Sequence, residues 1–339
     1  LDTGRSGHAA AALADGRVAV FGGFDTSASV TASIEIFDPV EETWTPSAAS
    51  LGTARARLTA TVLGDGRVLL CGGETESAAD VGLDLWEIFD PLADAITASG
   101  TMMERRTRHR AVTLGSGRIL LVGGSRTDSS GAPNFSRNSS EVFDPATLVS
   151  AAGPFMAVPR AGHDATLLPD GRVMVTGGHG TNALAEIYDP VAGSFSPGGT
   201  MTTARRDHAA APLPSGGVLA TGGGGFTAER WIPGENRWVQ VQNMGDARAL
   251  HTAVPLPSGR VFVAGGEKPG VGGGTFFHVA TEYYNPGTFT FLFPDIPTRV
   301  GRSGHTCTPL PGGDWLLVGG KSNLLGAPAV RSCDRFRLQ

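Results

Sequence analysis

The hydrophobic pattern of this 339-residue chain repeats seven times. Each copy contains a short, nearly uninterrupted apolar run, such as Val18-Ala-Val-Phe21, that ends at a Gly-Gly pair. A continuous apolar run, unlike an alternating one, is typical of a strand that is buried on both faces. The pairs begin at Gly22, Gly72, Gly123, Gly177, Gly222, Gly265 and Gly319, so that the period is 43 to 54 residues. This regularity predicts a repeat architecture.

Other residues keep a fixed distance from the Gly-Gly pair. Six residues before its first glycine is another glycine, as in Asp15-Gly16, which supplies the positive φ that a tight hairpin requires. Fourteen residues before it is a histidine in every copy except the second, which has Leu58, and three residues further back is an arginine in every copy. The histidines are His8, His109, His163, His208, His251 and His305, and the arginines are Arg5, Arg55, Arg106, Arg160, Arg205, Arg248 and Arg302.

Each copy predicts four strands, which we call A to D in chain order. Strand A starts at the histidine and is rich in small residues, which suits the crowded innermost position of a radial sheet. Strand B is the apolar run, and strand C carries a Glu-x-aromatic-x-Pro frame, such as Glu35 to Pro39. Strand D follows the proline and carries a bulky residue such as Trp44. The acids that begin strand C are Glu35, Glu87, Glu141, Glu186, Glu229, Glu282 and Asp334.

One such copy cannot bury both faces of its apolar run, whereas copies stacked around an axis can. We therefore predict an all-β fold with a single domain over residues 1–339, a seven-bladed β-propeller of four-stranded antiparallel blades. The predicted blades are approximately 5–54, 55–105, 106–159, 160–204, 205–247, 248–301 and 302–339.

The repeat resembles the kelch motif. The resemblance is carried by Arg-x-x-His, the hairpin glycine, the apolar run before Gly-Gly, and the Glu-x-aromatic-Asp-Pro frame followed by a tryptophan, and it covers about Arg5 to Gln339. It implies closure of the ring by strand exchange. The last copy has strands A to C but no strand D, so its outer strand is expected to come from outside these residues, before Leu1, with Leu1–Gly4 as its tail.

Composition narrows the function classes. The net charge is −5 and no long basic run occurs, which argues against nucleic acid as a partner. No apolar stretch approaches the ~18 residues of a membrane span. Cys71 is expected to be a small buried side chain. Cys307 and Cys333 fall on strands two apart, about 9.6 Å from each other, which disfavours a disulfide but leaves their pairing open.

The connections between strands divide between the two faces of the predicted disc. The A–B and C–D turns are short and lie on one face, whereas the B–C and D–A connections lie on the other and vary in length. Variable loops on a rigid scaffold commonly carry binding sites. The seven arginines and the seven acids are both expected on this loop face. Two interpretations stay open: a ring of guanidinium groups that grips a carboxylate or an acidic peptide, or arginines that pair with acids and backbone carbonyls.

Some features break the repeat and are further candidates for contact. The blade-three loop carries Arg126 and Arg137, and the blade-six loop carries Phe276-Phe277-His278. The alternative is that these loops pack on themselves. The six histidines recur once per blade, which is typical of a scaffold residue, so no metal site is predicted.

Some blades also resemble the galactose-oxidase family, in which two tyrosines and two histidines hold copper. Here the tyrosines are Tyr188, Tyr283 and Tyr284, all in strand C, and the residue before His251 is Leu250. We therefore predict no catalytic residue, no metal and no cofactor.

The leading hypothesis is a binding or scaffold module for a protein or peptide, or for a glycan, that acts through the loop face outside the cell, in the periplasm or at the cell surface. One alternative is a galactose-oxidase-like or other enzyme with its site at the channel mouth. The other is a subunit of an extracellular assembly, in which another chain completes blade seven.

Overall fold

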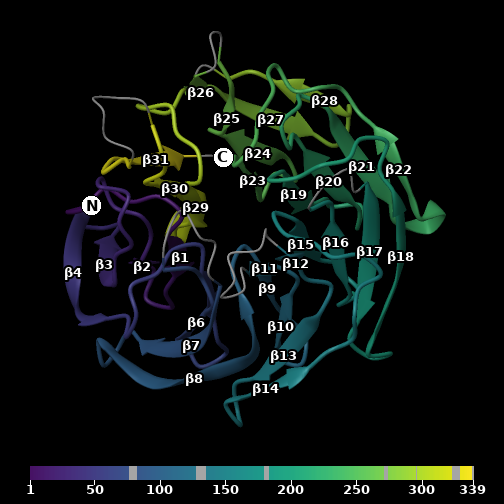
Figure 1. Ribbon diagram of the computed structural model, residues 1–339. Coiled ribbons are helices and arrows are strands. Elements are labelled where there is room, and N and C mark those ends of the chain that lie inside the picture. The colour runs from purple at the N-terminus through teal and green to yellow at the C-terminus, as the bar shows by residue number, and fades with distance from the viewer. Residues whose placement is uncertain are drawn as a thin grey trace.

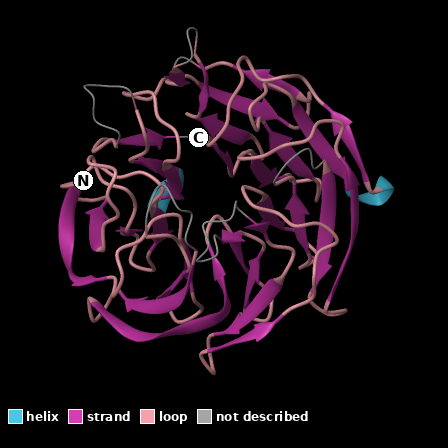
Figure 2. Ribbon diagram, in the orientation of Figure 1, coloured by secondary structure: helices cyan, strands magenta, loops and turns pink. Residues whose placement is uncertain are grey.

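The computed structural model describes residues 1–75, 82–126, 135–178, 183–270, 274–294, 296–322 and 329–337. Within them, seven antiparallel sheets stand radially around a central axis (Figure 1). Helix is limited there to two three-residue 3-10 turns, η1 (Pro233–Glu235) and η2 (Pro311–Gly313), and strands dominate (Figure 2). The predicted all-β, seven-bladed propeller is confirmed. No helix of the described residues is long and apolar enough to cross a membrane.

The strands follow the chain from the axis outwards in each blade. Blade one contains β1 (Ala9–Ala12), β2 (Val18–Phe21), β3 (Ser33–Asp38) and β4 (Thr43–Ser50). Blade two contains β5 (Thr59–Val62), β6 (Val68–Cys71), β7 (Leu83–Asp90) and β8 (Ala95–Arg106). Blade three contains β9 (Arg110–Thr113), β10 (Ile119–Val122), β13 (Ser140–Asp144) and β14 (Val149–Ala152). Blades four and five contain β15 (Asp164–Leu167), β16 (Val173–Thr176), β17 (Leu184–Asp189) and β18 (Ser194–Thr200); and β19 (Ala209–Pro212), β20 (Val218–Thr221), β21 (Ala228–Ile232) and β22 (Arg237–Gln240). Blades six and seven contain β23 (Thr252–Pro255), β24 (Val261–Ala264), β27 (Thr281–Asn285) and β28 (Thr290–Leu292); and β29 (Thr306–Pro309), β30 (Asp314–Val318) and β31 (Cys333–Arg337). Two small hairpins, β11 (Ser125–Arg126) with β12 (Phe135–Ser136) and β25 (Glu267–Pro269) with β26 (Thr275–Phe277), rise from the B–C loops of blades three and six.

The hydrophobic core lies between blades rather than within them. All four residues of β2, β6, β10, β16, β20 and β24 are buried, as the continuous apolar runs predicted. One cluster joins Phe21 of blade one to Val68 and Phe89 of blade two, and the two phenylalanine rings meet edge to face at 5.5 Å. Each apolar run is therefore covered by the neighbouring blades.

The Gly-Gly pair lets adjacent blades approach closely. Gly22 has a φ of +58°, and a Cβ there would lie 2.3 Å from the carbonyl oxygen of Arg55 in the next blade. Gly319 makes the same approach to the carbonyl oxygen of Arg5, at 2.4 Å. The last blade therefore contacts the first as the other blades contact one another.

Ring closure places the first residues beside the last blade. Blade seven has three strands among the described residues. The amino group of Leu1 donates to the carbonyl oxygen of Arg331 at 3.3 Å, as the amide of Leu51, just after β4, donates to that of Ala32 at 2.9 Å. Leu1 thus takes the place that follows strand D in a complete blade, and an outer strand before it stays a prediction.

The cysteines follow the expected spacing. Cys71 is buried, and Cys307 on β29 and Cys333 on β31 lie on either side of β30, so all three are free thiols.

Candidate binding site at the channel mouth

The seven repeat arginines form internal clamps. None is more than 1% exposed. In the fourth copy, Arg160 donates to Glu186 at 2.8 Å and to the carbonyl oxygen of Gly177 at 2.6 Å, and Glu186 accepts the amide of Ala157 at 2.7 Å. The same pairing joins Arg5 to Glu35, Arg55 to Glu87, Arg106 to Glu141, Arg205 to Glu229, Arg248 to Glu282 and Arg302 to Asp334.

The clamp joins the start of strand C, the end of strand B and the D–A connection of one blade. A ligand-gripping ring of these arginines does not fit their burial, whereas the pairing interpretation matches the contacts.

The repeat histidines join neighbouring blades. Five of them share a hydrogen bond through Nε2 with a threonine hydroxyl of the preceding blade: His8 with Thr306 at 2.9 Å, His109 with Thr59 at 3.0 Å, His208 with Thr176 at 2.8 Å, His251 with Thr221 at 2.8 Å and His305 with Thr252 at 3.1 Å. Burial lowers the pKa of His8, His109 and His208 to about 3, so these rings are neutral at ordinary pH.

Two blades depart from this pairing. Blade three offers Arg110 and Val122 where its counterparts have threonine, and both ring nitrogens of His163 lack a hydrogen-bond partner among the described residues. Blade one offers Ala9 and Phe21, and the following blade has Leu58, which packs in the same apolar cluster. Leucine thus replaces histidine where the preceding blade presents an apolar surface, whereas His163 is kept without a threonine partner.

A ring of left-handed residues forms the channel mouth. The residue before each histidine, or before Leu58, has a φ between +51° and +65°: Gly7, Arg57, Arg108, Gly162, Asp207, Leu250 and Gly304. This conformation costs a residue with a Cβ roughly 1–2 kcal/mol. Backbone hydrogen bonds join the ring residues of neighbouring blades, and in each the amide donates to the carbonyl oxygen of the preceding blade's ring residue. The pairs are Arg57 to Gly7 at 2.6 Å, Gly7 to Gly304 at 3.1 Å, Gly304 to Leu250 at 2.9 Å, Leu250 to Asp207 at 2.8 Å and Asp207 to Gly162 at 2.8 Å.

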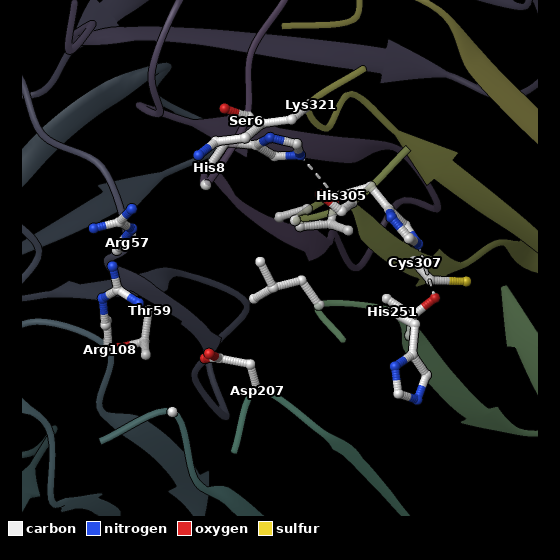
Figure 3. A pocket seen from close by; sticks show the side chains of 18 of the residues that line it. Ser6, His8, Arg57, Thr59, Arg108, Asp207, His251, His305, Cys307 and Lys321 are labelled. Atoms are coloured by element: carbon white, nitrogen blue, oxygen red, sulfur yellow. Dashed lines mark hydrogen bonds between the residues drawn. The ribbon is translucent and has the colours of Figure 1, made fainter. Parts of the chain in front are cut away.

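A cavity of about 440 Å³ opens within this ring, along the axis. Arg57, Arg108, Lys321 and the carboxylate of Asp207 line it (Figure 3), and a fourth cationic side chain, Arg110, also lines it. Its volume lies within the range of small-ligand sites. Below the mouth, its wall is formed by the small and hydroxyl side chains of strand A.

Several charges at the mouth are paired within the protein. Arg57 pairs with the fully buried Glu74 and lies over the ring of Phe24 at 5.2 Å. Arg110 pairs with Asp164 at 3.1 Å. Asp207 pairs with its neighbour Arg206 at 3.2 Å.

The loop residues expected to make contact lie in different environments. Arg126 is exposed on β11. Arg137 is half-buried and donates to Glu104 at 2.5 Å and to the carbonyl oxygen of Arg105 at 3.0 Å.

In the blade-six hairpin, Phe276 is 48% exposed and Phe277 is half-buried. His278 does not belong to an exposed patch, because it is 3% exposed and donates through Nε2 to the carbonyl oxygen of Ala247 at 2.8 Å.

Sequence reasoning did not assign Arg57, Arg108, Asp207 and Lys321 to the site. The signal that could have found the first three is the glycine that stands before the histidine in blades one, four and seven, because it indicates a position with positive φ. Among the described residues, no group of three or more His, Cys, Asp or Glu side chains is placed to hold a metal ion.

Comparison with known proteins agrees with this architecture. The family model of the kelch motif matches residues 5–49. No curated protein matches the sequence significantly. A solved structure of a fungal alcohol oxidase of the AA5 family, in complex with copper, is similar with a TM-score of 0.74 and 16% identity, over 98% of this chain and 73% of that chain. At this identity the likeness shows the fold alone. The motif match, which covers the first blade, and the seven blades together support a β-propeller built of kelch-like repeats.

Proposed function

We propose that this protein is a non-catalytic binding module that takes its ligand at the channel mouth and on the B–C and D–A loops around it. The observation that carries the proposal is the cavity of about 440 Å³ within the left-handed ring. Four of the seven ring residues keep a side chain in a conformation that favours glycine. Strained positions of this kind concentrate at functional sites.

A protein or peptide is the ligand that we favour, and a glycan is the second. The rigid, clamped scaffold changes little when a loop changes, which suits recognition by loops. Phe226 and Phe276, each about half exposed on a B–C loop, add apolar contact area on the same face. A location outside the cell or at its surface belongs to this proposal.

An enzyme with its site at the mouth is the alternative that the fold suggests, because the similar fungal structure is a copper-containing alcohol oxidase. The residues at this mouth do not fit copper. No ring position carries tyrosine, histidine or cysteine, and five of the six repeat histidines use Nε2 on a threonine. Tyr188 and Tyr284 are buried in strand C. Burial also raises the pKa of Cys307 in the cavity wall, which disfavours its thiolate.

A matched pair of variants tests the binding proposal. Leu250→Trp narrows the mouth without touching an arginine clamp, and Val191→Trp adds the same bulk to a 96% exposed turn on the other face. We expect peptides or glycans captured from defined arrays by the wild type to be lost by Leu250→Trp and kept by Val191→Trp. Equal binding by both variants would refute the mouth as the site.

Two further measurements address the alternatives. Stoichiometric copper uptake with oxygen consumption on primary alcohols would replace the binding proposal by the enzymatic one. A foreign strand found beside β31 in the purified protein would support the assembly hypothesis.

A further inference from the structure

We propose that the channel mouth selects an anionic ligand and places the anionic group beside Lys321, in the sector between blades seven and one. This inference rests on the proposed function and deepens it by naming the ligand class. Its three supports are the open space in that sector, the reversal of charge at position 321 and the two arginines on the opposite wall.

The open space follows from the side chains that the ring lacks. Two ring side chains lie over a ring glycine of the preceding blade: Arg57 Cγ is 3.5 Å from where a Cβ of Gly7 would be, and Asp207 Oδ1 is 2.6 Å from that of Gly162. The residue that would cover Gly304 is Gly7, which has no side chain. No atom of the described residues lies within 4 Å of a Cβ built on Gly304, so this sector of the mouth is open with respect to that part of the chain.

The charge at this sector is opposite to that at the equivalent positions of blades two and six, whereas the remaining blades have phenylalanine, serine, histidine and glycine there. The residue two places after the first glycine of the pair is Glu74 in blade two, Glu267 in blade six and Lys321 in blade seven. Each forms a backbone bridge with the residue after the repeat arginine of its own blade.

The two acids are used inside the protein. Glu74 accepts the hydroxyl of Thr107 at 2.7 Å, and Glu267 accepts that of Ser303, in each case from the following blade. In blade seven the equivalent pair would be Lys321 and Ser6. Figure 3 shows both on the same side of the cavity. Lys321 is exposed and forms no ion pair within the described parts of the chain.

The opposite wall carries two arginines. Figure 3 shows Arg57 and Arg108 on another side of the cavity, both half-buried. Arg57 is balanced by Glu74, and Asp207 by Arg206, so that the ion pairs at the mouth do not cancel the ammonium of Lys321. The protein as a whole carries a net charge of −5, so a cationic mouth is a local feature. A confined site of one sign attracts ligands of the other sign.

The experiment is calorimetric titration of the whole protein at low ionic strength with citrate, succinate, inorganic phosphate and uncharged galactose. The variant is Lys321→Gln, with Arg67→Gln as the control, since Arg67 lies in the A–B turn on the other face and pairs with Asp65. We expect at least one anion to bind more tightly than galactose, with a Kd that rises by about tenfold in Lys321→Gln, the effect of one lost charge-assisted contact. Arg67→Gln should bind as the wild type does, and salt should weaken binding.

The outcomes separate this inference from the proposed function. No anion binding above that of galactose, or equal anion affinity in Lys321→Gln, overturns the anion site. If uncharged peptides or glycans still bind in a manner that Leu250→Trp abolishes, the binding module stands and only the anion preference fails. Should Lys321→Gln melt at a lower temperature than the wild type, Lys321→Arg keeps the charge and is expected to retain binding.

Discussion

His163 lacks the threonine partner that the other five repeat histidines have, and Val122→Thr is expected to supply it. Val122 is fully buried and occupies the position of Thr176 and Thr221, which bond the histidine of the next blade at 2.8 Å. At Thr221 the hydroxyl also donates to the carbonyl oxygen of Ala209 at 3.2 Å, so both of its hydrogen-bonding roles are filled. A new threonine would meet His163 in the same geometry, because each ring packs against the preceding blade's glycine in the same way.

The expected gain follows from two opposing terms. Burying a hydroxyl costs roughly 1–3 kcal/mol, but here the hydroxyl is bonded. A net hydrogen bond contributes about 1 kcal/mol, and an unsatisfied buried group on His163 is relieved at the same time. We expect Val122→Thr to stabilise the fold by about 1 kcal/mol, or roughly 1–2 °C in Tm for a chain of this length. Thr221→Val, which removes the partner of His251, should destabilise by about 1–2 kcal/mol.

The assay is urea unfolding of both variants and of Val122→Thr in a His163→Leu background. Leu58 shows that the fold accepts leucine at this position. The gain should vanish in that background, because leucine offers no nitrogen to bond. If Val122→Thr lowers the unfolding midpoint, or raises it equally in both backgrounds, the reasoning about the missing partner is refuted.

Three other predictions concern the scaffold. Gly319→Ala would place a methyl group 2.4 Å from the carbonyl oxygen of Arg5 at a φ of +61°, and should cost more than about 2 kcal/mol. Gly64→Ala, which meets no described atom within 4 Å, should be close to neutral in thermal melting. Glu229→Gln should destabilise the fold by about 3–5 kcal/mol because it leaves the buried Arg205 without its charge partner. Replacing both residues by Met and Leu should destabilise it less. Equal losses of stability in the single and double variants would contradict this account. Since burial depresses the folded-state pKa of His8, His109 and His208 from about 6.5 to about 3, the unfolded chain binds more protons between these values, so stability is present above pH 6.5 and falls as the pH is lowered towards 3. His8→Leu should flatten the dependence of the urea midpoint on pH in this window, and an unchanged slope would show that other groups cause it.

The fold could be predicted from the sequence because its determinants are local and repeated. The apolar run that ends at Gly22 and the hairpin glycine at Gly16 each report burial or a positive φ at their own position, and seven copies remove the ambiguity of one. The sequence suggested that the arginines pair with acids but could not exclude that they bind a ligand, because both roles are compatible with the same residue types at the same positions.

The site was less predictable because neighbours impose it. Arg57 and Asp207 take a left-handed conformation because hydrogen bonds to the adjacent blades hold them there. Neither arginine nor aspartate, as a residue type, predicts a positive φ. His278 is buried because the blade-six hairpin returns it to Ala247, which depends on a loop with no counterpart in other blades. The open sector at Gly304 depends on the absence of a side chain at Gly7, nearly 300 residues away in the sequence and adjacent in space.

The hydrogen bond between His8 and Thr306 and the approach of Gly319 to Arg5 fasten the two ends of the chain near the axis. The propeller is thereby closed by contacts between its inner strands as well as at its outer edge. We therefore expect that loosening of the outer edge of β31 does not widen the central channel.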